Sequence, residues 1–262
     1  MIERFMQYLL PRATLPADAR EHRGHSGFDR PGPSEPGYAI CTTPRSGSNF
    51  LCQLLASTDC LGHPLEYFNA QARRTLDDAA YPDDAHEQIL KIRSVGATGN
   101  GLYGLKLFPH QHDAIREQVS WLEALPNLCF VSLERLDTLG QAISWARAIQ
   151  TGQYRSTSAS AGHPSFDRAL IASRLADIVR EQARWKVYFA RTGIEPVRIV
   201  YEDMIAAPGA AVASVARLFD LEAQARPDVS RVNVARQRDE LNEAWRARFI
   251  AEAGDPSHID PL

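Results

Sequence analysis

The chain has 262 residues, of which 44% are hydrophobic and 23% are charged, and its formal net charge is −3. This composition is typical of a soluble globular protein and excludes a disordered or fibrous chain. A negative net charge provides no basic field for nucleic acid or an anionic membrane, and no apolar run approaches the roughly 20 residues of a membrane-spanning helix. We therefore expect neither a nucleic-acid partner nor a membrane span.

Residues 1–37 are predicted to form an N-terminal arm, because residues 11–37 are rich in proline, glycine and charge and lack an apolar period. Glu3 and Arg4 interrupt the short apolar opening and no clear small-residue cleavage site follows, so we expect a cytoplasmic protein. The four cysteines show neither CxxC spacing nor a zinc-like cluster with histidine, which predicts reduced thiols and no bound metal.

Residues 38–262 are expected to form one domain in which strand-like apolar runs alternate with amphipathic stretches. That alternation predicts an α/β fold with three layers, α/β/α, around a central parallel sheet. Strands are predicted at residues 38–42, 102–108, 128–134 and 196–202, with a further short strand near 61–64. Helices are predicted at residues 48–58, after the strand 128–134, at 165–192 with Gly193 as the end, at 208–219 and at 236–253.

The segment TTPRSGSN (residues 42–49) joins the first strand to the first helix and has the composition of an anion site. Such a loop offers free backbone N–H groups, the positive end of a helix and hydroxyl donors, which suit phosphate or sulfate. No lysine follows the glycine as a Walker A loop requires, so a magnesium nucleotide is not the expected ligand. The candidate anion-binding residues are Pro44, Arg45, Ser46, Gly47, Ser48 and Asn49.

A second anion site is predicted where the strand 128–134 ends. Arg135 follows this strand directly, and Ser144 lies in the helix after it. Because the carboxyl ends of parallel strands meet at one edge of the sheet, Arg135 is expected beside the first loop. The two anion sites would then share one crevice.

These motifs resemble those of sulfotransferases. PRSGSNFL (44–51) resembles their 5′-phosphosulfate loop, and SWARAIQTG (144–152) resembles a stretch of the trehalose 2-sulfotransferase family, to which rhizobial lipopolysaccharide sulfotransferases are related. The resemblance implies a P-loop-like fold and the donor 3′-phosphoadenosine 5′-phosphosulfate (PAPS), with Arg45 at the phosphosulfate and Arg135 and Ser144 at the 3′-phosphate. It also implies a carbohydrate or glycolipid acceptor and a homodimer.

The reaction needs a base for the acceptor hydroxyl and cations over the shifting charge. The family has a GxPxEYF stretch, which here implies Glu66 as general base, with Lys106 and Arg45 as the cations. In many sulfotransferases a histidine follows a lysine by two residues, but Phe108 stands at that point here. His63 and His110 remain alternatives for the base, since histidine titrates near neutrality.

Further candidates come from the surroundings of these motifs. The acceptor-binding candidates are Tyr67, Phe68, Trp145 and Tyr154, and two further donor-binding candidates are Arg236 and Gln237 in the C-terminal segment. Two other functions share the same scaffold: a P-loop-type kinase and a noncatalytic nucleotide- or glycan-binding protein. Magnesium dependence would identify the kinase, and turnover would exclude a protein that only binds.

Overall fold

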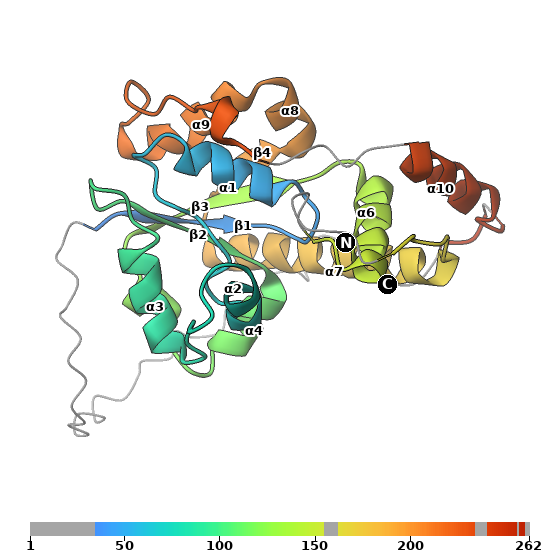
Figure 1. Cartoon of the computed structure of the whole chain (residues 1–262), viewed down its shortest axis with the longest axis horizontal. Helices are drawn as coiled ribbons and strands as arrows, with labels where there is room; N and C mark the ends of the chain where they lie inside the picture. The colour runs from blue at the N-terminus through green and yellow to red at the C-terminus, as the bar shows by residue number, and fades with distance from the viewer. Residues whose placement is uncertain (1–34, 155–161, 234–239, 256, 260–262) are drawn as a thin grey trace, which may run out of the picture. The chain divides into compact units, whose positions relative to one another are not determined.

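The computed structural model describes residues 35–154, 162–233, 240–255 and 257–259. They contain a sheet of four parallel strands in the order β2-β1-β3-β4 (Figure 1). The strands are β1 (Gly37–Cys41), β2 (Tyr103–Leu107), β3 (Leu128–Glu134) and β4 (Val197–Val200). The predicted arm 1–37 lies outside the described residues up to position 34, and its last residue, Gly37, already belongs to β1.

Both faces of the sheet are buried, so alternate residues of β1 enter two different cores. Tyr38 and Ile40 pack in one cluster, whereas Ala39 and Cys41 pack in the other. Burial on both faces explains why the strands read as continuous apolar runs rather than as alternating ones. The predicted three-layer α/β/α architecture is confirmed.

The helices divide between these two faces and a third cluster (Figure 1). One face carries α1 (Ser48–Ala56), α8 (Tyr201–Ala206) and α9 (Pro208–Ala216). The other carries α2 (Ala70–Leu76), α3 (Ala85–Ser94), α4 (Pro109–Ile115), α5 (Trp121–Ala124) and the second half of α7 (Arg168–Thr192). The third cluster joins α6 (Thr138–Thr151) and α10 (Glu240–Ala251) to the first half of α7.

The four main predicted strands and the long helix are present, with shifted ends. The strand predicted to reach residue 202 stops at Val200, because α8 begins at Tyr201. The long helix begins at Arg168, where Asp167 accepts a hydrogen bond from the N–H of Leu170, and ends before Gly193 with a φ of 69°. The predicted strand near 61–64 is wrong, since this part of the chain makes only a single bridge, from Leu65 to Leu105.

The four cysteines are free thiols. Cys41 and Cys52 are buried, and the other two are partly buried. Within the described ranges, no helix is long and apolar enough to cross a membrane. In the same part of the chain, no three metal-binding side chains of His, Cys, Asp or Glu lie together.

Candidate functional site

The loop between β1 and α1 is held from three sides. The hydroxyl of Thr42 donates to the carbonyl of Leu133 at the end of β3 (2.8 Å) and lies 2.7 Å from the hydroxyl of Ser46. The carbonyl of Thr42 accepts from the indole N–H of Trp185 in α7 (2.9 Å). These bonds fix the shape of the loop before any ligand arrives.

The backbone of this loop leaves four consecutive amides without a protein acceptor among the described residues. Arg45 and Gly47 both have positive φ, 62° and 87°. A Cβ atom at position 47 would lie 2.3 Å from the ring of Tyr201, so only glycine fits there. Among the described residues none accepts a hydrogen bond from the backbone N–H of Ser46, Gly47, Ser48 or Asn49. Successive free N–H groups at the start of a helix are suited to binding an anion.

The side chain of Arg45 connects this loop to α6. Its Nε atom donates to Ser144 Oγ (3.0 Å), and Nη1 donates to the carbonyl of Tyr154 (2.7 Å). Burial lowers the pKa of the guanidinium to about 10, and the nearby charges of Arg135 and Arg147 act in the same direction. The site therefore holds an excess of positive charge that a bound anion would neutralise.

Arg135 follows β3 and lies under the same loop. One of its terminal nitrogens is 3.5 Å from the carbonyl of Arg45, the other is 3.3 Å from Asp137, and the guanidinium lies 5.0 Å from the ring centre of Tyr201. Its buried Nε atom has no hydrogen-bond partner among the described residues. A buried donor without a partner is costly, and an anionic ligand would supply the missing acceptor.

Two polar residues that the motifs did not indicate hold this arrangement. Gln141, fully buried in α6, donates to the hydroxyl of Thr43 (2.8 Å) and to the carbonyl of Pro44 (2.6 Å). Asp137 caps α6 by accepting from the N–H of Gly140 and also pairs with Arg246 of α10. The aspartate before a helical pattern was a readable cap signal, whereas a buried glutamine gives no signal before the fold is known.

A second polar group lies at the carboxyl end of β2. Lys106 Nζ is 2.7 Å from Glu66 Oε1 and 2.6 Å from Oδ1 of Asn49, which belongs to the loop at residues 42–49, here called the anion loop. Glu66 Oε2 accepts from the amides of Asn69 and Gln111, both at 3.0 Å. The whole Lys106 residue is only 3% exposed, so it is no solvated strand-end lysine.

The carboxyl of Glu66 is ionised and firmly bound. Burial by itself raises its pKa, but the charge of Lys106 and the hydrogen bonds from Lys106, Asn69 and Gln111 outweigh burial and lower the pKa to about 2. Glu66 is thus a weak proton acceptor while Lys106 stays beside it.

The sequence matches the Stf0 sulphotransferase family over residues 37–252. The chain belongs to this family. It is 28% identical to the trehalose 2-sulfotransferase of Mycobacterium tuberculosis, over 82% of this chain and 95% of that protein. The trehalose 2-sulfotransferase of Mycolicibacterium smegmatis is 23% identical with the same coverage. A solved sulfotransferase from Mycobacterium tuberculosis is 18% identical, with 83% of this chain and 76% of that chain aligned and a TM-score of 0.41.

In this sulfotransferase the residues predicted to bind the acceptor differ in how far they are buried. Tyr67 and Phe68 are 1% and 7% exposed and lie in the core cluster below the sheet, so we correct their assignment from acceptor binding to packing. Trp145 is partly buried in the third cluster, with the guanidinium of Arg174 5.0 Å from its ring centre. Tyr154 is 53% exposed and remains accessible to an acceptor. Arg236 and Gln237 lie outside the described residues.

The two histidine alternatives differ in their surroundings. His63 uses its backbone to bond Gly96 and Tyr67. His110, at the start of α4, pairs with Glu181 of α7 at 2.7 Å. In the described residues, this ion pair holds the ring of His110, whereas the side chain of His63 lies near the charge of Asp59.

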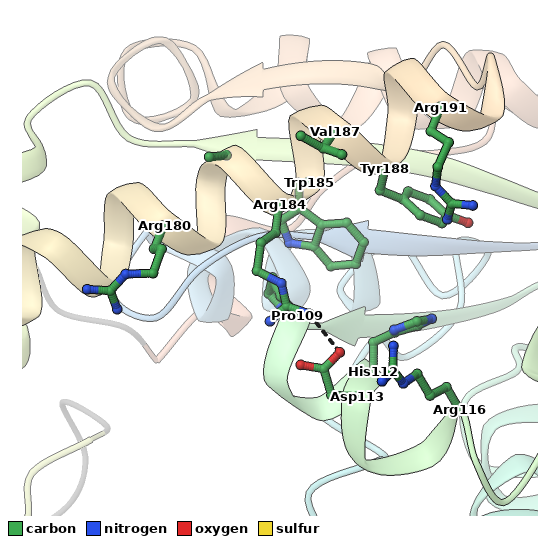
Figure 2. Close-up of a pocket in the computed structure, with 11 residues that line it drawn as sticks. Pro109, His112, Asp113, Arg116, Arg180, Arg184, Trp185, Val187, Tyr188 and Arg191 are labelled. Carbon is green, nitrogen blue, oxygen red and sulfur yellow. Dashed lines mark hydrogen bonds and ion pairs between the residues drawn. The ribbon is translucent and has the colours of Figure 1, made fainter. Parts of the chain in front are cut away.

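A cavity of about 420 Å³ between α4 and α7 involves none of the predicted site residues (Figure 2). Its lining includes the rings of Trp185 and Tyr188 and the guanidinium groups of Arg116 and Arg191. In the described structure, Trp185 is the one residue that both lines this cavity and bonds the loop between β1 and α1, through its hydrogen bond to Thr42.

Proposed function

We propose that this sulfotransferase moves a sulfuryl group from PAPS to a hydroxyl of a carbohydrate or glycolipid acceptor. The observation that carries the proposal is the hydrogen bond from Arg45 to Ser144, which joins the two anion motifs into one site. A donor with phosphates at both its 5′ and 3′ positions needs two such motifs side by side, whereas ATP needs only one.

The residues present suit this donor. The N–H groups of residues 46–49, which have no acceptor among the described residues, and the Arg45 guanidinium would hold the 5′-phosphosulfate. Arg135, whose buried Nε lacks a partner among the described residues, and Ser144 would hold the 3′-phosphate. When bound, the donor supplies an activated sulfuryl group whose S–O bond to phosphate breaks as the acceptor oxygen attacks.

Lys106 and Glu66 are the proposed residues of the transfer step. Lys106 contacts Asn49 of the loop and would offset the negative charge that develops on the departing phosphate. Glu66 would accept the proton of the acceptor hydroxyl. Its low pKa depends on Lys106, so a shift of the lysine toward the donor's charge would raise that pKa and make Glu66 a stronger base.

The proposed class of acceptor is based on the names of the relatives. Both curated relatives are named trehalose 2-sulfotransferases. We extend this to a sugar hydroxyl here, on trehalose or a glycolipid, with Tyr154 and Trp145 as candidate contacts. A homodimer in the cytoplasm is part of the same proposal.

Calorimetry with 3′-phosphoadenosine 5′-phosphate, ADP and magnesium ATP tests the donor. We expect tight binding of the 3′-phosphorylated nucleotide alone, and preference for magnesium ATP would instead support a kinase. Transfer of labelled sulfate from PAPS to trehalose and a panel of related sugars tests the reaction. Donor binding without transfer to any hydroxyl compound would instead support the noncatalytic binding protein.

A further inference from the structure

An ion pair bridges α4 and α7 beside the residues proposed for donor binding and for the transfer step. His110 Nδ1 lies 2.7 Å from Glu181 Oε1. The carboxylate side chain is 13% exposed and its other oxygen is buried without a partner among the described residues, whereas the histidine side chain is 53% exposed. The glutamate therefore fixes the imidazole by one nitrogen and leaves the rest of the ring accessible.

The ring of His110 continues a row of side chains that starts at the transfer residues. Lys106 Nζ lies 5.5 Å from the ring centre of Phe108, and that ring lies 5.5 Å from the ring of His110. Gln111, the next residue, donates to Glu66. Because α4 starts directly after β2, His110 stands at the same edge of the sheet as Glu66 and Lys106.

We infer that His110, oriented by Glu181, binds the acceptor through a hydrogen bond between Nε2 and a hydroxyl other than the reacting one. This inference rests on the proposed function and deepens it, because it requires an acceptor with at least two nearby hydroxyls, as in a sugar. A hydroxyl both donates and accepts, so the contact persists in either protonation state of the imidazole.

The charges around His110 agree with this role. The hydrogen bond to Glu181 raises the pKa of His110, burial lowers it, the charges of Glu181 and Glu66 raise it and that of Arg184 lowers it. Glu181 contacts the ring from α7, whereas Arg184, one turn further along the same helix, and Glu66, in the segment before α2, act on it through their charges. The carboxylates prevail, so the imidazole keeps its second proton to a higher pH than an ordinary histidine.

The same two helices provide a matched control. Asp113 and Arg184 lie one turn further along α4 and α7, respectively, and form a second bridge at 2.7 Å (Figure 2). This pair lines the cavity between the helices rather than the row that leads from Lys106. If His110 and Glu181 only fasten α4 to α7, removal of either bridge should have the same effect.

The test compares His110→Ala, Glu181→Gln and Asp113→Asn in the full chain, with transfer to the best sugar of the panel. We expect His110→Ala to raise the acceptor KM about tenfold, the loss of one hydrogen bond. The kcat should stay within about threefold and the affinity for 3′-phosphoadenosine 5′-phosphate should not change. Glu181→Gln should raise KM less, and Asp113→Asn should leave it unchanged.

A set of deoxy sugars makes the test specific. The analogue without the contacted hydroxyl should have the same KM with the wild type and with His110→Ala. An unchanged KM in His110→Ala, or equal changes in His110→Ala and Asp113→Asn, overturns the inference while leaving the proposed function intact. A wild type that transfers to no sugar overturns the proposed acceptor class, and the inference with it.

Discussion

Lys106 Nζ lies 2.7 Å from Glu66 Oε1, and the lysine side chain is only 4% exposed. A buried charge and its partly buried partner are retained where further hydrogen bonds satisfy them, and here Asn49, Asn69 and Gln111 do so. Because Lys106 contacts both the anion loop and the proposed base, a charge that arrives at the loop changes the electrostatic field at Glu66.

Glu66→Gln should separate transfer from donor binding. The amide keeps the shape of the side chain but cannot accept the proton, so we expect kcat to fall about 100-fold or more. Affinity for 3′-phosphoadenosine 5′-phosphate should stay within about threefold, as measured by calorimetry. A strong loss of donor affinity would contradict the assignment of Glu66 as base.

The same ion pair predicts how stability depends on pH. The pKa of Glu66 is about 2 in the folded protein, below its unfolded value of about 4.3. The ion pair therefore stabilises the fold fully above the unfolded pKa and loses its effect as the pH falls toward the folded pKa. Its contribution at neutral pH is at most about 3 kcal/mol.

Urea unfolding of the wild type and Glu66→Gln at several pH values measures this effect. The difference in free energy of unfolding should be largest near pH 7 and shrink as the pH falls from about 5 toward 2, because the carboxyl of the unfolded chain gains its proton while that of the folded protein is still ionised. A difference that stays constant over this range would mean that the charge of Glu66 does not stabilise the fold.

The two arginines of the donor site should differ in which nucleotide they affect. Arg135→Ala should weaken binding of 3′-phosphoadenosine 5′-phosphate about 10- to 100-fold and leave ADP nearly unchanged, because only the former has a 3′-phosphate. Arg45→Ala should weaken both. Arg217→Ala removes an exposed arginine that pairs with Glu222 and serves as the control. Equal losses for both nucleotides in Arg135→Ala would contradict its assignment.

Gly47→Ala should damage both stability and donor binding. The new methyl group would strike the ring of Tyr201 at 2.3 Å, and the residue would keep a φ of 87°. We expect a loss of about 1 to 3 kcal/mol, seen as a lower Tm, and weaker binding because Tyr201 also packs on Arg135. Gly209→Ala, where no atom lies within 4 Å of the new methyl group, should not be destabilising. Similar Tm values for the two variants would contradict the steric argument.

The closeness of Arg135 to the loop between β1 and α1 could be predicted from sequence, because each directly follows a strand of the same parallel sheet. The environment of Glu66 could not, since its partners come from β2, α4 and the cap of α2. Tyr67 and Phe68 illustrate the limit. They follow the proposed base directly, but the turn closed by the N–H of Asn69 and the carbonyl of Glu66 takes them into the core.

The sequence pattern does not predict the short helices α2 to α5, for a related reason. They have four to ten residues and lie in segments where single turns and loops alternate. Helices of this length are stabilised by tertiary packing rather than by intrinsic propensity. Two of them matter for the site, because α2 begins after Asn69 and α4 contains His110 and Gln111.

The bond from Trp185 to the carbonyl of Thr42 gives the protein a built-in optical reporter. The chain has four tryptophans, and in the described structure Trp185 is the one whose indole N–H bonds the anion loop. Indole emission is sensitive to hydrogen bonding, so we expect the fluorescence of Trp185 to change when this bond changes. A variant with phenylalanine at positions 121, 145 and 245 would retain a single emitter whose spectrum follows the loop, so ligand occupancy could be timed by stopped-flow fluorescence without a label.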